Sequence, residues 1–178
     1  MKFRKFFWLS NLIVSLIFFN LSQGWTQTKS GGNAPVITHS FAIEKGRYGD
    51  VLKIFIEADD LDGDMLRIAT VAYRNGSPRH PTDWVYLKPQ FQRHFIGYLQ
   101  WNTFGSRGER IREWTEITLG VSVFDKAGNE SNEVLFPFQF VSEVVRNPKP
   151  PAPFNEGNIP RLGYININVG GGSESEGH

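Results

Sequence analysis

Between residues 35 and 142, hydrophobic and polar positions alternate in short runs, as expected for β-strands with one buried face. In the clearest run, residues 115–124, Ile117, Leu119, Val121 and Val123 share one face. The period of two predicts strands at residues 36–43, 51–58, 65–73, 84–87, 95–101, 115–124 and 134–141. Pro137 places the last of these at a sheet edge or a bulge, because proline cannot donate to a β-ladder.

Turn-forming residues separate these runs, and no window of ten or more residues after residue 24 shows a helical period. The turn signals fall at residues 45–49, 60–64, 75–78, 105–108 and 126–129. Short strands with regular turns predict an all-β domain over residues 35–142, and a β-sandwich of about seven strands in preference to a barrel.

The first 24 residues have the order of a secretory signal peptide. A basic start with Lys2, Arg4 and Lys5 precedes the apolar run 6–21, and small residues follow up to Gly24. We expect cleavage near Gly24 and export to the periplasm or the extracellular space. The alternative is an uncleaved membrane anchor, although the apolar run is shorter than the roughly 20 residues that a spanning helix needs.

The two flanks of the predicted domain differ from it in composition. Residues 25–34 are polar and glycine-rich, and predict a flexible lead-in. Residues 143–178 predict a proline-rich linker and a largely disordered tail, with one possible strand at 164–169. There Ile165, Ile167 and Val169 share a face. We expect them to add to a sheet edge, either the domain's own or a partner's; the alternative is a tail that happens to alternate.

Composition excludes several classes of function. The chain has no cysteine, which excludes disulfides, thiolate metal sites and a cysteine nucleophile. Removal of residues 1–24 changes the formal net charge from +1 to −2, too weak a charge to favour nucleic acid or anionic lipid. The four histidines show no metal-ligand spacing, and no serine lies in a Gly-x-Ser-x-Gly turn. We therefore expect a protein that is not an enzyme, and that meets a membrane only through an uncleaved signal.

The sharpest local motif is an acidic loop after the second predicted strand, with Asp59, Asp60, Asp62 and Asp64 around Gly63. In a sandwich this loop shares one end with Asn33 and with the turn that begins at Asp125. Clustered carboxylates are ligands that Ca²⁺ prefers. The sequence therefore predicts either a calcium site formed by these five aspartates or a hydrated acidic turn, in which Lys126 could neutralise one carboxylate.

These motifs resemble the bacterial immunoglobulin-like and cadherin-like modules of secreted and surface proteins. The resemblance covers residues 33–142 and rests on Asn33-Ala-Pro35, the loop Ala58–Leu66 and the segment Val123–Ser131, which contains Asp-x-x-Gly-Asn. It implies an immunoglobulin-like antiparallel sandwich present here in a single copy. The Asn-to-Pro spacing is one residue shorter than in the family pattern, and the linker motifs of calcium-rigidified cadherin arrays are missing.

The middle of the domain is basic and aromatic. Residues 74–114 carry a local excess of four positive charges, interleaved with Trp84, Trp101, Trp114 and other aromatic residues. Exposed aromatic rings stack on sugars, and arginine binds anionic groups. These tryptophans therefore predict either a partner-binding face for an envelope or surface protein or a glycan, or ordinary core packing.

Three functional hypotheses follow. The first is an exported, non-enzymatic interaction module of the cell envelope or surface, with Ca²⁺ as its only candidate cofactor. The second is a small carbohydrate-binding module that uses exposed aromatic residues. The third is a structural subunit that assembles through its C-terminal strand. Exposure of the tryptophans separates the first two hypotheses, and the state of residues 159–169 bears on the third.

Overall fold

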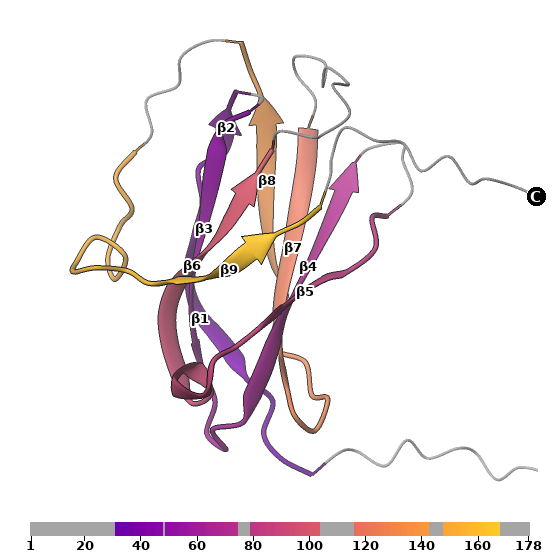
Figure 1. Cartoon of the computed structure of the whole chain (residues 1–178), viewed down its shortest axis with the longest axis vertical. Coiled ribbons are helices and arrows are strands. Elements are labelled where there is room, and N and C mark those ends of the chain that lie inside the picture. Colours follow the sequence, from indigo (N-terminus) through magenta and orange to yellow (C-terminus); the bar gives the residue numbers. More distant parts are fainter. Residues whose placement is uncertain (1–30, 48, 75–78, 104–115, 143–147, 168–178) are drawn as a thin grey trace, which may run out of the picture.

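Nine strands form two facing sheets within residues 31–47, 49–74, 79–103, 116–142 and 148–167, which the computed structural model describes (Figure 1). One sheet has the order β1 (Val36–Phe41), β3 (Val51–Asp59), β6 (His94–Asn102), β9 (Arg161–Ile165). The other has the order β2 (Lys45–Gly46), β8 (Val134–Phe140), β7 (Glu116–Asp125), β4 (Met65–Arg74), β5 (Asp83–Tyr86). A short 3-10 turn, η2 (Pro89–Phe91), precedes β6.

All seven strands predicted for residues 35–142 are present, with bounds that differ by at most two residues. The all-β sandwich is therefore confirmed. The pattern did not predict β2, which has only two residues and pairs in parallel with β8 at Gln139 and Phe140. No helix in the described ranges has the length and apolar character needed to cross a membrane. The predicted signal peptide lies outside the described residues.

The alternating positions of each strand supply the core between the sheets. On β3 the inward side chains are at most 3% exposed, whereas Lys53 between them is exposed. On β7 the inward side chains are at most 2% exposed. These two rows are Leu52, Ile54, Ile56 and Ala58 on β3, and Ile117, Leu119, Val121 and Val123 on β7. Burial of these apolar faces is the main source of stability, because the chain has no disulfide.

The order of the strands defines an immunoglobulin-like topology. In chain order β1, β3 and β6 take the places of strands A, B and E in one sheet of such a domain. The strands β4, β7 and β8 take the places of C, F and G in the other sheet, and β5 extends that sheet beyond C. The described chain is thus an immunoglobulin-like β-sandwich, as the sequence resemblance implied.

The C-terminal strand occupies the position next to β6, where strand D lies in the seven-strand immunoglobulin domain. It runs parallel to β6, with Gly163 opposite Leu99 and Ile165 opposite Trp101. In Figure 1, β9 crosses the front of the sandwich next to β5, the edge strand of the other sheet. Thus β9 closes the gap between the two sheets along this side.

Two glycines make this close approach feasible. A Cβ atom on Gly163 would collide with the side chain of Val85 on β5. A Cβ atom on Gly97 of β6 would lie 2.5 Å from Cγ of Leu162. Because these positions lack side chains, Leu162 and Val85 can fill the space and remain 8% and 7% exposed.

The segment before β9 runs across the outer face of the β1-β3-β6-β9 sheet. Phe154 is 5% exposed, and its ring centroid lies 5.5 Å from that of Phe55 on β3. The Phe55 ring also contacts the rings of Phe41 and Tyr98, at 6.2 and 5.7 Å. The N–H of Tyr98 donates to the carbonyl of Pro160 at 3.0 Å, immediately before β9 begins. An aromatic cluster therefore anchors this proline-rich segment to the sandwich.

The structure differs here from the domain boundary expected at residue 142. Residues 148–167 pack on the sandwich, and the strand at 161–165 overlaps the expected range 164–169 only at Tyr164 and Ile165. The difference arises because β9 pairs with β6, a strand distant in sequence that the local pattern does not reveal. Leu162 packs against Gly97 of β6, and Ile165 lies opposite Trp101. Residues 143–147 and 168–178 lie outside the described ranges.

Candidate functional site: the acidic loop and an arginine–aromatic surface

The segments that the sequence placed at one end of the sandwich do meet there. The backbone and side-chain nitrogens of Asn33 donate to the carboxylate of Asp62. The N–H of Lys126 donates to the carbonyl of Asp64 at 3.1 Å. Three separate parts of the chain thus converge on the loop between β3 and β4.

Within this loop the carboxylates organise the backbone. Asp60 is 3% exposed and accepts the N–H groups of Asp62 and Asp64, at 3.0 and 2.9 Å. In the neighbouring turn Asp125 is also 3% exposed and accepts the backbone and side-chain N–H groups of Asn129, at 2.7 and 2.6 Å. Each of these two buried carboxylates therefore has hydrogen-bond donors from its own turn, as buried charge requires.

An arginine from the connection between β5 and β6 holds the outside of the loop. Nη1 of Arg93 donates to the carbonyl of Leu61 at 2.7 Å, and Nη2 donates to the carbonyl of Asp62 at 3.3 Å. The guanidinium lies where a Cβ on Gly63 would be, and Gly63 has a φ of +75°. The positive φ therefore favours glycine at this position, and a Cβ there would displace the Arg93 guanidinium.

Asp64 is the member of the group whose ionised form is disfavoured. Burial raises its pKa above the ordinary 3.8, and so do a hydrogen bond with Asp60 and the negative charges of Asp125, Asp60 and Asp62. Its Oδ1 is buried and has no hydrogen-bond partner within the described residues. Ionisation of Asp64 at neutral pH therefore costs folding free energy.

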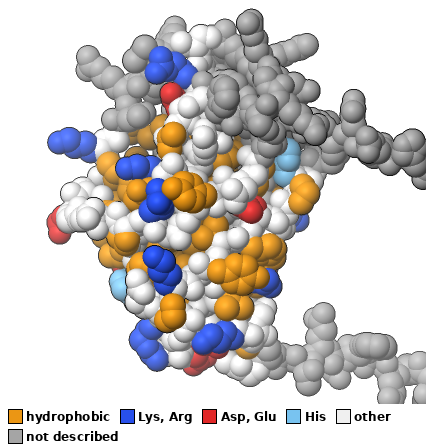
Figure 2. Space-filling view, in the orientation of Figure 1, with side chains coloured by type: hydrophobic (Ala, Val, Ile, Leu, Met, Phe, Trp, Pro, Cys, Tyr) orange, Lys and Arg blue, Asp and Glu red, His pale blue; other side chains and the backbone are white. Residues whose placement is uncertain are grey.

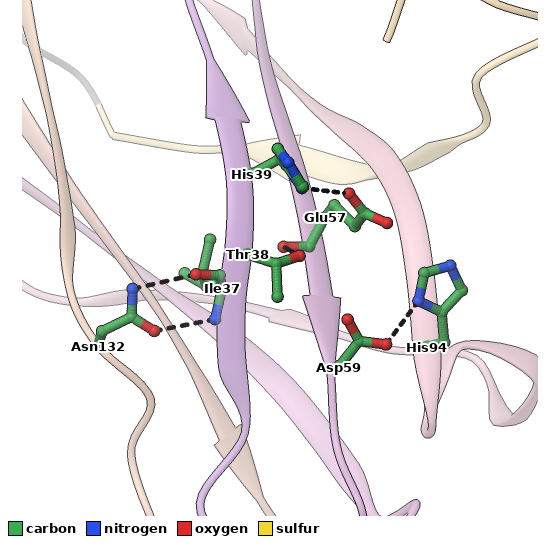
Figure 3. Close-up of polar contacts among 7 residues, drawn as sticks. All are labelled: Ile37, Thr38, His39, Glu57, Asp59, His94 and Asn132. Carbon is green, nitrogen blue, oxygen red and sulfur yellow. Dashed lines mark hydrogen bonds and ion pairs between the residues drawn. The ribbon is translucent and has the colours of Figure 1, made fainter. Parts of the chain in front are cut away.

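Asp59 belongs to a different face, because successive side chains of a strand point to opposite sides. It lies on the outer face of β3, where its Oδ1 is 2.8 Å from Nδ1 of His94 (Figure 3). Nearby, Nδ1 of His39 on β1 is 2.7 Å from Oε2 of Glu57. Both histidines are about half exposed or more, so each pair contributes little to stability.

Figure 3 also shows Asn132, just before β8, which spans both backbone groups of Ile37 on β1. Its Oδ1 accepts the N–H of Ile37 at 2.9 Å, and its Nδ2 donates to the carbonyl of Ile37 at 3.2 Å. This clasp ties an edge strand of one sheet to the connection that enters the other. We assign it a structural role, because it joins two backbone segments of the sandwich.

The described residues contain no group of three or more acidic or histidine side chains placed to hold a metal ion. Of the five predicted ligands, the structure brings together Asp60, Asp62, Asp64 and Asp125, and separates Asp59 from them. Nζ of Lys126 donates to Oε1 of Gln92 at 3.1 Å and forms no ion pair with these carboxylates among the described residues. Asp60 and Asp125 accept N–H groups of their own turns, and the calcium site stays a prediction.

The second candidate site is a surface on the outer face of β4, β5 and β7, formed by Arg67, Trp84, Tyr86 and Phe124. We call it the arginine–aromatic surface. Arg67 on β4 lies opposite Tyr86 on β5 and opposite Phe124 on β7. The guanidinium carbon of Arg67 is 3.8 Å from the centroid of the Trp84 ring and 5.9 Å from that of Phe124. Tyr86 is 63% exposed.

Stacking orders this arginine. A guanidinium plane over an indole ring is held by cation–π attraction and by dispersion, so its rotamer is restricted before any ligand arrives. The Trp84 and Phe124 rings meet edge to face at 5.3 Å and fix each other. Nε of Arg67 is buried and has no hydrogen-bond partner among the described residues. Arg67 also forms no ion pair within that part of the chain.

The three tryptophans predicted as partner-binding residues have different positions. Trp101 is 1% exposed and packs in the core, where its indole N–H donates to the carbonyl of Ile167 at 3.0 Å. The prediction of partner binding is therefore wrong for Trp101, because its position on β6 points inward. Trp84 is half-buried on the outer face. Trp114 lies outside the described residues.

The sequence predicted that Ile165, Ile167 and Val169 add to a sheet edge, the domain's own or a partner's, and β9 pairs with β6 of its own domain. Ile165 is 4% exposed and Ile167 is 8% exposed, and both belong to the hydrophobic core. The N–H of Asn166 between them donates to Oδ2 of Asp83 on β5 at 2.8 Å. Val169 lies outside the described residues. In this structure these side chains complete their own domain.

A second arginine–tyrosine pair lies on β9. The guanidinium carbon of Arg161 is 4.3 Å from the ring centroid of Tyr164, which is 49% exposed. Arg161 differs from Arg67, since its Nη1 already donates to Oε1 of Gln100 at 3.3 Å. The pair resembles the arginine–aromatic surface in composition and belongs to the other sheet.

Two surface hollows lie away from these groups. One, of about 290 Å³, lies beside the proline-rich segment and is lined by Phe41, Phe55 and Pro150 among others. The other, of about 280 Å³, lies on the outer face of the second sheet beside Tyr73.

The hydroxyl of Tyr73 donates to Oε1 of Glu133 at 3.1 Å. Burial of Tyr73, together with this carboxylate, raises the pKa of Tyr73 above the ordinary 10.0.

Arg67 and Tyr86 were not among the site residues that the sequence pattern predicted. The signal that could have found them is the alternation itself, which places Arg67 and Ala69 on the outer face of the third predicted strand, and Trp84 and Tyr86 on one face of the fourth. What the alternation does not supply is the register that brings Arg67 beside Trp84.

Comparison with protein-family models gives no match, and comparison with curated proteins gives none either. Among solved structures, the chain is similar to the PKD domain of an M14-like peptidase from Thermoplasmatales archaeon SCGC AB-540-F20. That match has 11% identity and a TM-score of 0.41, and covers 63% of this chain and 100% of the other.

The chain is also similar to the CARDB domain of a Pyrococcus furiosus protein, which was solved in complex with di-metal ions. Here the identity is 11% and the TM-score 0.33, over 64% of this chain and 97% of the other. At these values neither likeness carries an argument about ligand or activity. The assignment to the immunoglobulin-like class rests on the strand topology of this chain.

Proposed function

We propose that this chain is an exported, non-enzymatic interaction module that contacts its partner through the arginine–aromatic surface. The observation that carries the proposal is the exposed ring of Tyr86 beside an arginine that is already ordered by Trp84. Tyrosine, tryptophan and arginine are the residues most enriched where binding energy concentrates in interfaces. A rigid anchor of this kind loses little conformational entropy on binding.

Export is part of the same proposal. The basic, apolar and small-residue order of residues 1–24 supports it, and the absence of cysteine is compatible with any redox environment. Mass spectrometry of the chain expressed in full should find an N-terminus near Trp25. An intact Met1 recovered with membranes would show an anchor instead.

Site-specific photo-crosslinking tests the binding surface. A photoreactive amino acid replaces Tyr86 in the mature chain, and the matched control replaces Tyr164, the exposed tyrosine of the other arginine–tyrosine pair. With extract of the native envelope, we expect a defined adduct at position 86 that is absent at position 164 and weakened by Arg67→Lys. Equal adducts at both positions, or none at 86, would contradict the proposed surface.

Calcium is a second proposal, for the acidic loop. Its support is the buried, unpartnered Oδ1 of Asp64 among the charges of Asp60, Asp62 and Asp125, which a divalent cation would neutralise. Against it, the described carboxylates accept N–H groups and do not surround a common point. Thermal melts of the mature chain in millimolar Ca²⁺ and in chelator decide between a calcium site and a hydrogen-bonded turn.

A further inference from the structure

We infer that the arginine–aromatic surface binds an acidic polysaccharide, with Arg67 holding a sugar carboxylate and Tyr86 stacking on the ring of the same or the next sugar. This inference rests on the proposed function and names the ligand class. It begins from the state of Arg67, which carries a full positive charge with no carboxylate partner among the described residues.

The orientation of Arg67 selects a planar anion. The guanidinium carbon of Arg67 lies 3.8 Å from the centroid of the Trp84 ring, and a guanidinium held on a ring in this way can donate its two Nη groups side by side to a carboxylate. Such charge-assisted hydrogen bonds are about twice as strong as neutral ones. Because Trp84 and Phe124 already fix the guanidinium, a ligand gains these bonds without ordering the side chain.

The neighbouring rings select a flat, partly apolar ligand. Register places Tyr86, Arg67 and Phe124 side by side across β5, β4 and β7. A sugar ring presents one face of C–H groups to an aromatic ring and hydroxyl groups around its rim, so a tyrosine with an apolar body and a polar tip suits it. A chain of sugars that carry carboxylates meets both requirements at once.

The charge around the surface agrees with an anionic ligand. Figure 2 shows one face of the molecule, on which Lys and Arg side chains are interspersed among hydrophobic ones. Two acidic residues lie near the surface, and both carboxylates already accept hydrogen bonds. Asp83 on β5 accepts the N–H of Asn166, and Glu130, which pairs with Phe124, accepts the hydroxyl of Ser122 at 2.7 Å. Neither forms an ion pair with Arg67 among the described residues, so the guanidinium is left to attract an anion.

Affinity electrophoresis of the mature chain tests this, with polygalacturonate as the acidic polysaccharide, dextran as the neutral one and a short DNA duplex as an unrelated polyanion. We expect retardation by polygalacturonate alone, and a weakening of at least about tenfold by Tyr86→Ala, which is about 1.4 kcal/mol. Arg67→Lys keeps the charge and should weaken binding as well, because lysine lacks the planar fork.

Tyr164→Ala and Arg161→Ala are the matched controls and should leave binding unchanged. Circular dichroism melts establish that each variant is folded, and Tyr86→Ala removes only an exposed ring. Equal retardation by dextran or DNA, or equal losses in the Tyr86 and Tyr164 variants, would overturn the inference. If polygalacturonate fails while the adduct at position 86 contains peptides of another protein by mass spectrometry, the ligand is a protein and only the polysaccharide inference falls.

Discussion

The indole N–H of Trp101 donates to the backbone carbonyl of Ile167 at 3.0 Å and so joins β6 to the chain beyond β9. Both residues are in the core, at 1% and 8% exposure, and they are separated by 66 positions in the sequence. A buried side chain of the domain thus depends on a backbone group in the C-terminal segment. This relationship makes the segment part of the fold.

Trp101→Phe should destabilise the domain, because it leaves the carbonyl of Ile167 buried without its donor. The expected cost is about 1–3 kcal/mol for the unsatisfied group, with a further loss from the smaller ring. Urea unfolding measures it through the midpoint at constant slope. Trp84→Phe, on the half-exposed outer face, is the control and should cost less; equal costs would contradict the role of the bond to Ile167.

Gly163→Ala should be destabilising for a different reason, overpacking between β9 and β5. The added Cβ would collide with Val85, and strain of this kind costs about 1–3 kcal/mol. Val85→Ala removes the colliding atoms, so the double variant should be more stable than the sum of the two single effects predicts. Strict additivity in this cycle would show that β9 and β5 are not packed as described.

Tyr73 predicts a pH effect in the alkaline range. Its folded pKa is raised above 10.0, so the neutral phenol is favoured in the folded state. The stabilisation from this preference is fully present below pH 10, and is lost as the pH rises through the higher folded pKa. The stability of Tyr73→Phe relative to the parent should therefore increase between pH 9 and pH 11.5, as read from urea midpoints. Parallel pH profiles would remove this effect.

The raised pKa of Asp64 predicts a stability effect at neutral pH. Its raised pKa means that the stability present below about pH 3.8 is lost as the pH rises through the folded pKa. In chelator at pH 7, Asp64→Asn should therefore melt at a higher temperature than the parent. If the loop binds Ca²⁺, millimolar Ca²⁺ raises the melting temperature of the parent alone. Superimposable melting curves of the parent in calcium and in chelator would contradict a calcium site in this loop.

Local pattern was sufficient for most of the sandwich. The predicted strands follow from alternation, and five turn signals separate most of them. Asp60-Leu-Asp-Gly-Asp64 forms a turn whichever sheet it joins. The meeting of that loop with Asn33 and Asp125 followed from counting connections in a sandwich. These features depend on residues close in sequence, or on topology alone.

The features that the sequence pattern left open depend on contacts between distant segments. The pattern predicted a C-terminal strand at residues 164–169 that adds to a sheet edge, but not its bounds or its neighbour, because β6 lies some sixty positions earlier. Arg67 is an unremarkable outward residue until the register of β4 and β5 places Trp84 beneath it. Trp101 and Trp84 look alike in the sequence, and only the direction of each strand face separates the core residue from the surface residue.

Residues 161–167 belong to the sandwich. Amide hydrogen exchange of the mature chain alone is the most direct test of this. Hydrogen bonding to β6 slows exchange to the rate set by unfolding of the domain. We therefore predict that the β9 amides that face β6 are protected to the same order as those of β6 itself, with no partner added. Exchange of residues 161–167 at the random-coil rate, while β6 stays protected, would contradict the account.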